Sequence, residues 1–435
     1  MRSFVRIPAH RRHELRHLVT RSQRVMVMAG LVGVVTGAFV ALFDSLIANV
    51  MVDHLGGLPP WALAFVPGVG LVVARAARQL ISPGTSAATA DEYIEAFHER
   101  SHPLRWRPFA ARTVGAVATL GSGAPMGLEG MSVYAGATIG SNIQRRFPRL
   151  FRNADHRLLM VAGAAAGVAA IFKAPATGAV FAMEVPYQDD LARRMLLPAL
   201  VAAATGYLTF VAVHGTVPLF AIDAASAFSI RDLLGAVAVG VLAGLCARVF
   251  AKMLRTAKLV AVGDHPWLAT VGAGIVLAAM FGLGRALTGE SLMIGPGYHV
   301  VEWAAQPGHS IPVLLGILAL RCMATSVAVA GGGVGGLFIP LVVAGALTGA
   351  VIGTAVNRFD LTLFIVIGVA AFLGAGYRVP LAAVMFVAET TGRPSFIVPG
   401  LLAAVAAELV MGSSSVTAYQ RRTDHAATTT THVPT

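Results

Sequence analysis

The chain has 435 residues, of which 56% are hydrophobic, 12% are charged and 47 are glycines. This composition is too apolar for a soluble enzyme, and the net charge of +12 is concentrated at the ends and in loops, so no nucleic-acid partner is indicated. We therefore expect an all-α polytopic membrane protein embedded in lipid, with no cofactor.

Residues 1–24 form a basic segment with seven arginines and one acid, Glu14. The positive-inside rule predicts that this segment is cytoplasmic. His13 and His17 flank Glu14 in the HExxH pattern of zinc proteases. The surrounding arginines would repel a dication and no third ligand is obvious nearby, so we expect a solvated basic face and no metal site.

Apolar stretches of about spanning length recur along the chain. They are 25–50, 61–81, 158–185, 196–213, 233–250, 268–287, 311–320, 337–356, 361–387 and 396–411. Several are shorter than 18 residues or are interrupted by Gly and Pro. Interrupted segments at membrane depth survive only where protein or a watery cavity covers the freed backbone. This favours a transporter or channel over a membrane anchor.

A polar interruption, Ser82–Arg107, comes directly after the second apolar stretch. Thr89 or Asp91 could cap a helix that starts there, and its N-terminus would suit an anion. The next stretch, Gly121–Ser141, places a single carboxylate, Glu129, in a glycine-rich and otherwise uncharged run. An acid at membrane depth costs about 2.5–3.5 kcal/mol unless it faces a polar pathway. We therefore expect Glu129 to face one.

The second half of the chain repeats the first. Residues 127–137 align with 336–346, with identities at the first two positions and again at Val, Ala, Gly and Ala. Further on, an offset of 205 residues superposes Glu184 on Glu389 within a shared F/Y-K/R-x-P pattern. Repeats with broken helices at corresponding positions predict a binding site at their interface. Sequence identity does not tell parallel from inverted repeats. The basic N-terminus and the pair Arg421-Arg422 predict that both ends are cytoplasmic, which an inverted pair with an odd number of crossings in each repeat would satisfy.

The repeats predict five segments. They are a cytoplasmic basic segment over 1–24, a first membrane repeat over 25–216, a linker over 217–232, a second membrane repeat over 233–419 and a cytoplasmic polar tail over 420–435.

Broken helices beginning near Glu129 and Phe338 would turn two N-termini toward one point. Helix N-termini expose unpaired N–H groups and the positive end of the macrodipole. Such partial charges can bind an anion and still release it, whereas full positive charges would hold it too tightly. The sequence thus favours conduction of a small anion.

These motifs resemble those of the CLC family of chloride channels and chloride/proton antiporters. GLEGM, residues 127–131, is similar to the family's G-K/R-E-G-P motif, and GGLFIP, residues 335–340, to its GGxFxP motif. The segments AIFKAPATGAVFAMEV and YRVPLAAVMFVAETT resemble two further family segments. The resemblance covers roughly residues 20–425. It implies a homodimer of inverted-repeat subunits in a bacterial inner or plasma membrane, each subunit with its own chloride pathway.

The resemblance makes Glu129 the gating glutamate, whose carboxylate competes with the anion and moves aside when protonated. The amides of Phe338 and Ile339 would hold the anion, and Tyr419 would coordinate it through its hydroxyl. The remaining anion-binding candidates come from the same motifs and from the preceding polar interruption: Gly127, Leu128, Gly130, Gly336 and Ser86.

This chain departs from the family pattern at several positions. Leu128 and Met131 replace the usual basic residue and proline around the gate. The family's GSGxP serine motif is degraded, so Thr85, Ser86 or Thr89 could take the serine's place. Val185 replaces the inner proton-transfer acid of many family antiporters, as in family channels.

The loss of that acid favours a channel-like protein, because a proton relay needs a titratable group and valine has none. Glu184 could substitute, but its counterpart Glu389 suggests that both are structural acids satisfied by helix N-termini. Chloride/proton or fluoride/proton antiport is the alternative. A remote alternative is an intramembrane enzyme using Glu129, His13 or His17.

Overall fold

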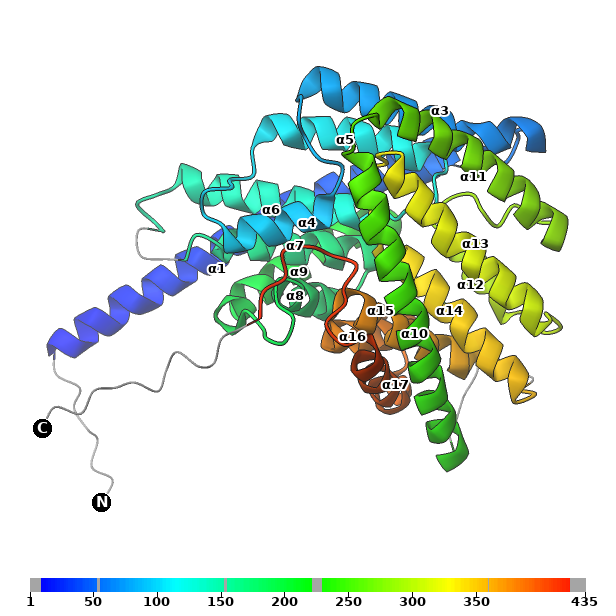
Figure 1. Cartoon of the computed structure of the whole chain (residues 1–435). Helices are drawn as coiled ribbons and strands as arrows, with labels where there is room; N and C mark the ends of the chain where they lie inside the picture. The colour runs from blue at the N-terminus through cyan, green and yellow to red at the C-terminus, as the bar shows by residue number, and fades with distance from the viewer. Residues whose placement is uncertain (1–8, 53–54, 152–154, 221–228, 359, 423–435) are drawn as a thin grey trace, which may run out of the picture.

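The computed structural model describes the backbone of residues 9–52, 55–151, 155–220, 229–358 and 360–422, and the side chains among these from residue 23 onward except 49–52. The described part is built of helices, arranged as in Figure 1. Those of the first half are α1 (Ala9–Asp44), η1 (Ser45–Val52), α3 (Pro60–Ile81), α4 (Thr89–His98), α5 (Trp106–Gly121), α6 (Glu129–Arg146), α7 (Leu158–Phe172), α8 (Pro175–Glu184), η2 (Arg193–Met195) and α9 (Leu196–His214).

The second half follows the same order. Its helices are α10 (Ile230–Ala261), α11 (Pro266–Thr288), α12 (Tyr298–Ala305), α13 (Ile311–Ala330), α14 (Phe338–Ala355), α15 (Thr362–Tyr377), α16 (Pro380–Thr391), η3 (Pro394–Phe396) and α17 (Ile397–Met411). Among the described residues, 8 helices are long and apolar enough to cross a membrane. The expected all-α polytopic architecture is confirmed.

Two of the apolar stretches, 158–185 and 361–387, are each a pair of helices. Lys173 follows the last residue of α7 and Arg378 that of α15, and both cap residues adopt the left-handed conformation, with φ of 54° and 58°. A left-handed residue ends a helix, and the prolines that open α8 and α16 have the φ that a first helical position needs. The repeated K/R-x-P pattern therefore marks the break between two helices.

The inverted repeats appear as matched helices. α6 and α14 both have 18 residues, and their bounds differ by the same 209 positions that separate Glu129 from Phe338. α6 packs on α7 and α14 on α15 through facing glycines, Gly136 on Gly163 and Gly345 on Gly368. At each pair a Cβ would collide with the backbone of the partner helix. Small residues thus let these helices approach closely inside the membrane.

Two helices run across expected segment boundaries, and one expected helix cap differs. α1 runs unbroken from Ala9 to Asp44, so the expected 1–24 segment is partly the start of the first long helix. α10 begins at Ile230, inside the expected linker 217–232, where Ser229 and Asp232 form a capping box. α4 begins at Thr89, so the expected cap, Thr89 or Asp91, is wrong: the N-cap residue is Ala88, which makes no side-chain bond. The side chains of His13 and His17, and residues 423–435, lie outside the described part.

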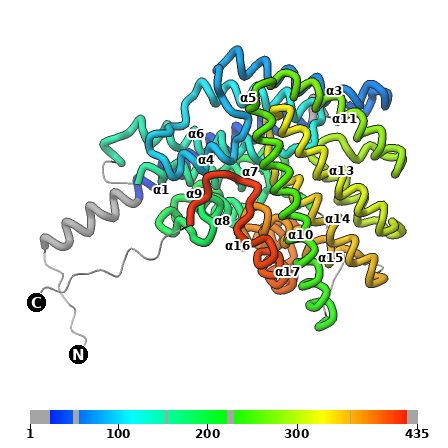
Figure 2. Tube along the Cα trace, in the orientation of Figure 1, coloured from blue at the N-terminus to red at the C-terminus, as the bar shows by residue number. Residues whose placement is uncertain are grey.

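The C-terminal segment after α17 crosses back over the first repeat, as the red trace in Figures 1 and 2 shows. The Ala418 N–H donates to Asp91 Oδ1 of α4 at 2.9 Å, and Lys258 Nζ of α10 donates to Val416 O at 2.8 Å. The Gln188 N–H donates to Arg421 O at 3.1 Å. The segment thereby ties the two repeats together along one face.

Candidate anion site

The N-termini of α6 and α14 meet where the two repeats touch. Gly127 and Gly336, directly before these helices, form an isolated antiparallel bridge. Gly127 N donates to Gly336 O at 2.9 Å, and Gly336 N donates to Gly127 O at 2.6 Å. Because both helices start beside this bridge, the positive ends of their dipoles lie close together. The geometry is that of an anion site made from backbone amides.

The Glu129 carboxylate sits on the amides of the opposite repeat. Its Oε1 accepts hydrogen bonds from Phe338 N at 2.5 Å and from Ile339 N at 3.3 Å. The side chain is 3% exposed, and Oε2 has no hydrogen-bond partner among the described residues. A Cβ at Gly336 would overlap the carboxylate, so glycine is required there. An anion bound to these amides would have to displace Glu129.

The other predicted residues of the two motifs lie around this carboxylate. Leu128 is buried and caps α6 with helical backbone angles. A Cβ at Gly130 would come within 2.5 Å of Thr89 Oγ1 and 2.7 Å of Gly336 Cα. The structure therefore brings the predicted motif residues together, with Thr89 beside them.

A cavity of about 400 Å³ lies next to the bridge. Its lining combines the start of α4, the approach to α14, part of α10 and the C-terminal segment. The polar and aromatic residues among those that line it are Ser86, Thr89, Asp91, Glu92, Glu95, Arg255, Lys258, Tyr377, Thr417 and Tyr419. The cavity thus extends to Gly336 and Leu337, directly before α14.

The Ser86 hydroxyl is occupied by neighbours within the protein. It donates to Glu92 Oε1 at 2.8 Å and accepts from Arg112 at 3.1 Å. Thr89 is buried, and its hydroxyl makes only a long bond of 3.4 Å to Gly335 O. Of the three hydroxyl candidates from the sequence, Thr85 does not line the cavity, Ser86 is engaged by Glu92 and Arg112, and Thr89 lies beside Gly130.

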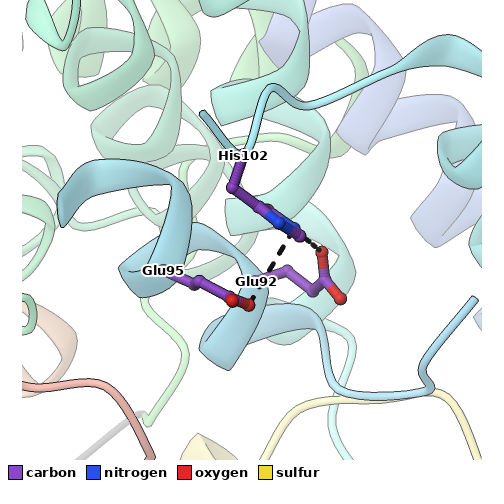
Figure 3. Close-up of side chains that lie close together, drawn as sticks. All are labelled: Glu92, Glu95 and His102. Atoms are coloured by element: carbon purple, nitrogen blue, oxygen red, sulfur yellow. Dashed lines mark hydrogen bonds and ion pairs between the residues drawn. The ribbon is translucent and has the colours of Figure 1, made fainter. Parts of the chain in front are cut away.

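Arg112 holds a buried network next to this cavity. Its guanidinium lies 2.5 Å from Glu92 Oε1 and donates to the Tyr134 hydroxyl at 2.6 Å. Figure 3 shows Glu92, Glu95 and His102 turned toward one another, with His102 Nε2 3.1 Å from Glu92 and 3.9 Å from Glu95. Three such groups could ligate a metal. Because Arg112 already neutralises Glu92, the cluster is better described as an ion-pair network.

Two tyrosines line the cavity in different settings. Tyr419 is 52% exposed, whereas Tyr377, at the end of α15, is 1% exposed. The Tyr377 ring lies 6.3 Å from the Phe338 ring and 5.5 Å from Phe181, and its electrostatic neighbours include Leu337 N–H and the Glu129 carboxylate. The sequence missed Tyr377 as a site residue, although its alignment with Phe172 already placed it in the repeated pattern.

Glu184 and Glu389 accept hydrogen bonds from helix N-termini in a reciprocal arrangement. Glu184, at the end of α8, accepts from Leu381 N at 3.1 Å and Ala382 N at 2.9 Å of α16. Glu389 of α16 accepts from Ala176 N at 2.9 Å and Thr177 N at 2.7 Å of α8. Each carboxylate thus supplies the acceptor that the other repeat's helix start lacks.

Three comparisons bear on identity. The family model described as "Voltage gated chloride channel" matches residues 69–412. The "H(+)/Cl(-) exchange transporter ClcA" of Yersinia pseudotuberculosis is 28% identical over 423 residues, covering 91% of this chain and 87% of that protein. The protein of the same description from Salmonella paratyphi B is 27% identical and covers 92% and 88%.

Solved structures share the fold. A slow cyanobacterial Cl-/H+ antiporter matches with a TM-score of 0.77 at 21% identity, covering 89% of this chain and 94% of that one. A CLC-type fluoride/proton antiporter matches with a TM-score of 0.79 at 21% identity, covering 92% and 98%. Because the family model spans more than half of the sequence and the fold agrees, the chain belongs to the CLC family of voltage-gated chloride channels and transporters.

Proposed function

We propose that this protein exchanges chloride for protons, with Glu129 as the group that both ions use. The observation that carries the proposal is the Glu129 carboxylate on the Phe338 and Ile339 amides. A negatively charged carboxylate competes with an anion for those N–H groups, whereas a protonated one is neutral and leaves more readily. Protonation and anion binding at one site are thereby coupled. The curated relatives, named H(+)/Cl(-) exchange transporters, support the same conclusion.

The residues that line the cavity indicate which side of the membrane it faces. Thr417 and Tyr419 of the C-terminal segment line it, so it lies on the side of that terminus. With the seven arginines of the first 24 residues on the cytoplasmic side, both termini and the cavity are cytoplasmic in our proposal. Glu95, which lines the same cavity as Tyr377, offers a titratable group on this side.

Uncoupled chloride conduction is the second candidate, and Val185 favours it. The side chain is 1% exposed and cannot carry a proton. The neighbouring acid, Glu184, is bound to two amides of α16 and is therefore a structural group in this proposal. If no other acid relays protons from the cytoplasmic side, Glu129 would gate conduction without exchange. Family resemblance further suggests a homodimer with one pathway in each subunit.

Purified protein in liposomes tests these alternatives. The vesicles are loaded with chloride, and chloride efflux and external pH are recorded together with electrodes. Exchange predicts proton movement against its gradient in fixed proportion to chloride. Chloride efflux without uphill proton movement would support conduction instead, and absence of anion flux would refute both. Parallel runs with fluoride establish which halide is preferred.

A further inference from the structure

Three acids of the short helix α4 line the cavity beside the anion site: Asp91, Glu92 and Glu95. Two of them are bound to a cation. Asp91 Oδ2 accepts a hydrogen bond from Lys258 Nζ at 2.6 Å, and Glu92 Oε1 lies 2.5 Å from the Arg112 guanidinium. Their charges are therefore matched within the protein.

Glu95 is bound less tightly than its two neighbours. In the described part of the chain its ion-pair partner is His102, whose Nε2 lies 3.9 Å from Glu95 Oε2, beyond hydrogen-bond distance. The other charged or titratable groups that line the cavity or contact this cluster are Arg112, Arg255, Lys258, Tyr377 and Tyr419. Glu95 is thus an acid whose oxygens remain available to a proton.

His102 places this acid in contact with water. The imidazole follows α4 and is turned toward Glu95, as Figure 3 shows. The His102 side chain is 41% exposed and that of Glu95 is 20% exposed. A surface imidazole can take up a proton from water and pass it to a neighbouring carboxylate. The pair therefore has the arrangement of a proton entrance.

The cavity connects Glu95 with the gate. Glu95 and Gly336 both line it, and a Cβ at Gly336 would overlap the Glu129 carboxylate. Two tyrosine hydroxyls share this lining: the electrostatic neighbours of Tyr419 include Glu95, and those of Tyr377 include Glu129. With ~30 Å³ for each water molecule, a cavity of about 400 Å³ has room for a chain of waters between the two carboxylates.

The acid at the end of α8 is less suited to this task. The Glu184 carboxylate accepts hydrogen bonds from the Leu381 and Ala382 amides, and its neighbour Val185 is 1% exposed and has no titratable group. Neither residue lines the cavity. Glu95 is better placed than Glu184 to exchange protons with Glu129.

We propose that Glu95 loads protons from the cytoplasm, receiving them from His102 and passing them to Glu129 through the cavity that also admits chloride. Glu95 takes one proton from the His102 imidazolium and becomes neutral, and a proton then moves along the cavity to the Glu129 carboxylate. Neutral Glu129 leaves the Phe338 amide, and chloride takes its place. The inference rests on the proposed exchange and adds the cytoplasmic half of the proton route.

Variants of Glu95 separate its titratable group from its place in the fold. Glu95→Gln keeps the size of the side chain and removes the proton-binding group, whereas Glu95→Asp keeps an acid. Glu99→Gln is the matched control, because Glu99 caps the same helix, is 43% exposed and pairs with Arg421 at 3.0 Å. We expect E95Q to lower proton flux by about tenfold or more while chloride efflux continues, and E95D and E99Q to retain exchange.

His102→Gln tests the delivery step, since it removes the imidazole and leaves Glu95 in place. We expect it to lower proton flux by about threefold or more without changing chloride efflux. The measurement is chloride and proton flux recorded together from liposomes, on variants that elute as the wild type does on size exclusion.

Wild-type proton flux in E95Q, or an equal loss in E95Q and E99Q, would overturn the inference. If E95Q does not fold, H102Q decides, and unchanged proton flux in it would overturn the inference as well. Chloride efflux without uphill proton movement in the wild type would instead refute the proposed exchange, so the two failures are distinguishable.

Discussion

Glu129→Gln tests the central feature of the site, because it keeps the shape of the side chain and removes its charge. The carboxylate accepts two backbone hydrogen bonds, a short one of 2.5 Å and a long one of 3.3 Å. A hydrogen bond to a charged group contributes about 1.5–3 kcal/mol and a neutral one about 0.5–1.5 kcal/mol. Replacing the carboxylate by an amide therefore weakens the interaction with the strongly bound Phe338 amide and the weakly bound Ile339 amide by about 2 kcal/mol in total. The side chain then competes with the anion for these amides roughly 30-fold less well.

We therefore expect E129Q to transport chloride at a rate that no longer depends on pH, and to bind chloride about tenfold or more tightly. Proton exchange should disappear, since the amide cannot be protonated in this range. The assay is chloride efflux from liposomes across the titration range of a carboxyl group, with chloride binding measured by calorimetry. Unchanged pH dependence in a folded E129Q protein would show that Glu129 is an ordinary buried acid and would refute the gating argument.

Three further predictions concern the surroundings of the gate. Glu184→Gln, the same substitution on another pair of amides, should keep the pH dependence of flux and cost about 1–3 kcal/mol of stability, seen as a lower melting temperature. Thr89→Val should weaken chloride binding in calorimetry, whereas Ser86→Ala should leave it nearly unchanged. A larger loss of chloride affinity in S86A than in T89V would make Ser86 the anion ligand. Tyr377→Phe should lower chloride affinity several-fold while Tyr419→Phe changes it little; equal effects would remove the distinction drawn from burial.

The sequence predicted the helical class, the repeats and the identity of the central carboxylate, since each of these depends on a local pattern. A single acid among glycines stands out within residues 121–141, and the GGLFIP motif has its own recognisable spacing. The contact between Glu129 and the Phe338 amide was expected only from the alignment of the repeats and from family resemblance. The structure shows that contact directly.

The sequence names Thr89 among three hydroxyl candidates but could not say which of them lies at the site, and it missed Tyr377. Thr89 lies against Gly130 because α4 packs on α6. Tyr377 is the last residue of α15 and lines the cavity beside residues of α4, α10 and the C-terminal segment. The residues of the GLEGM and GGLFIP motifs do not indicate which distant helices pack against them. Ser86 is also a candidate by its chemistry, but its hydroxyl is engaged by Glu92, six residues away, and by Arg112, 26 residues away on another helix, a contact that no local pattern reveals.

The inverted repeats explain why carboxylates of one half lie on amides of the other. Each repeat presents helix N-termini that a carboxylate from the other repeat satisfies, at Glu129 on α14, at Glu184 on α16 and at Glu389 on α8. The last two are matched by symmetry, whereas the residue equivalent to Glu129 is Phe338, which supplies an amide instead of an acid. Two equivalent carboxylates would each cover the other's amides. Because only the first repeat carries the acid here, a single carboxylate lies on the amides that open α14.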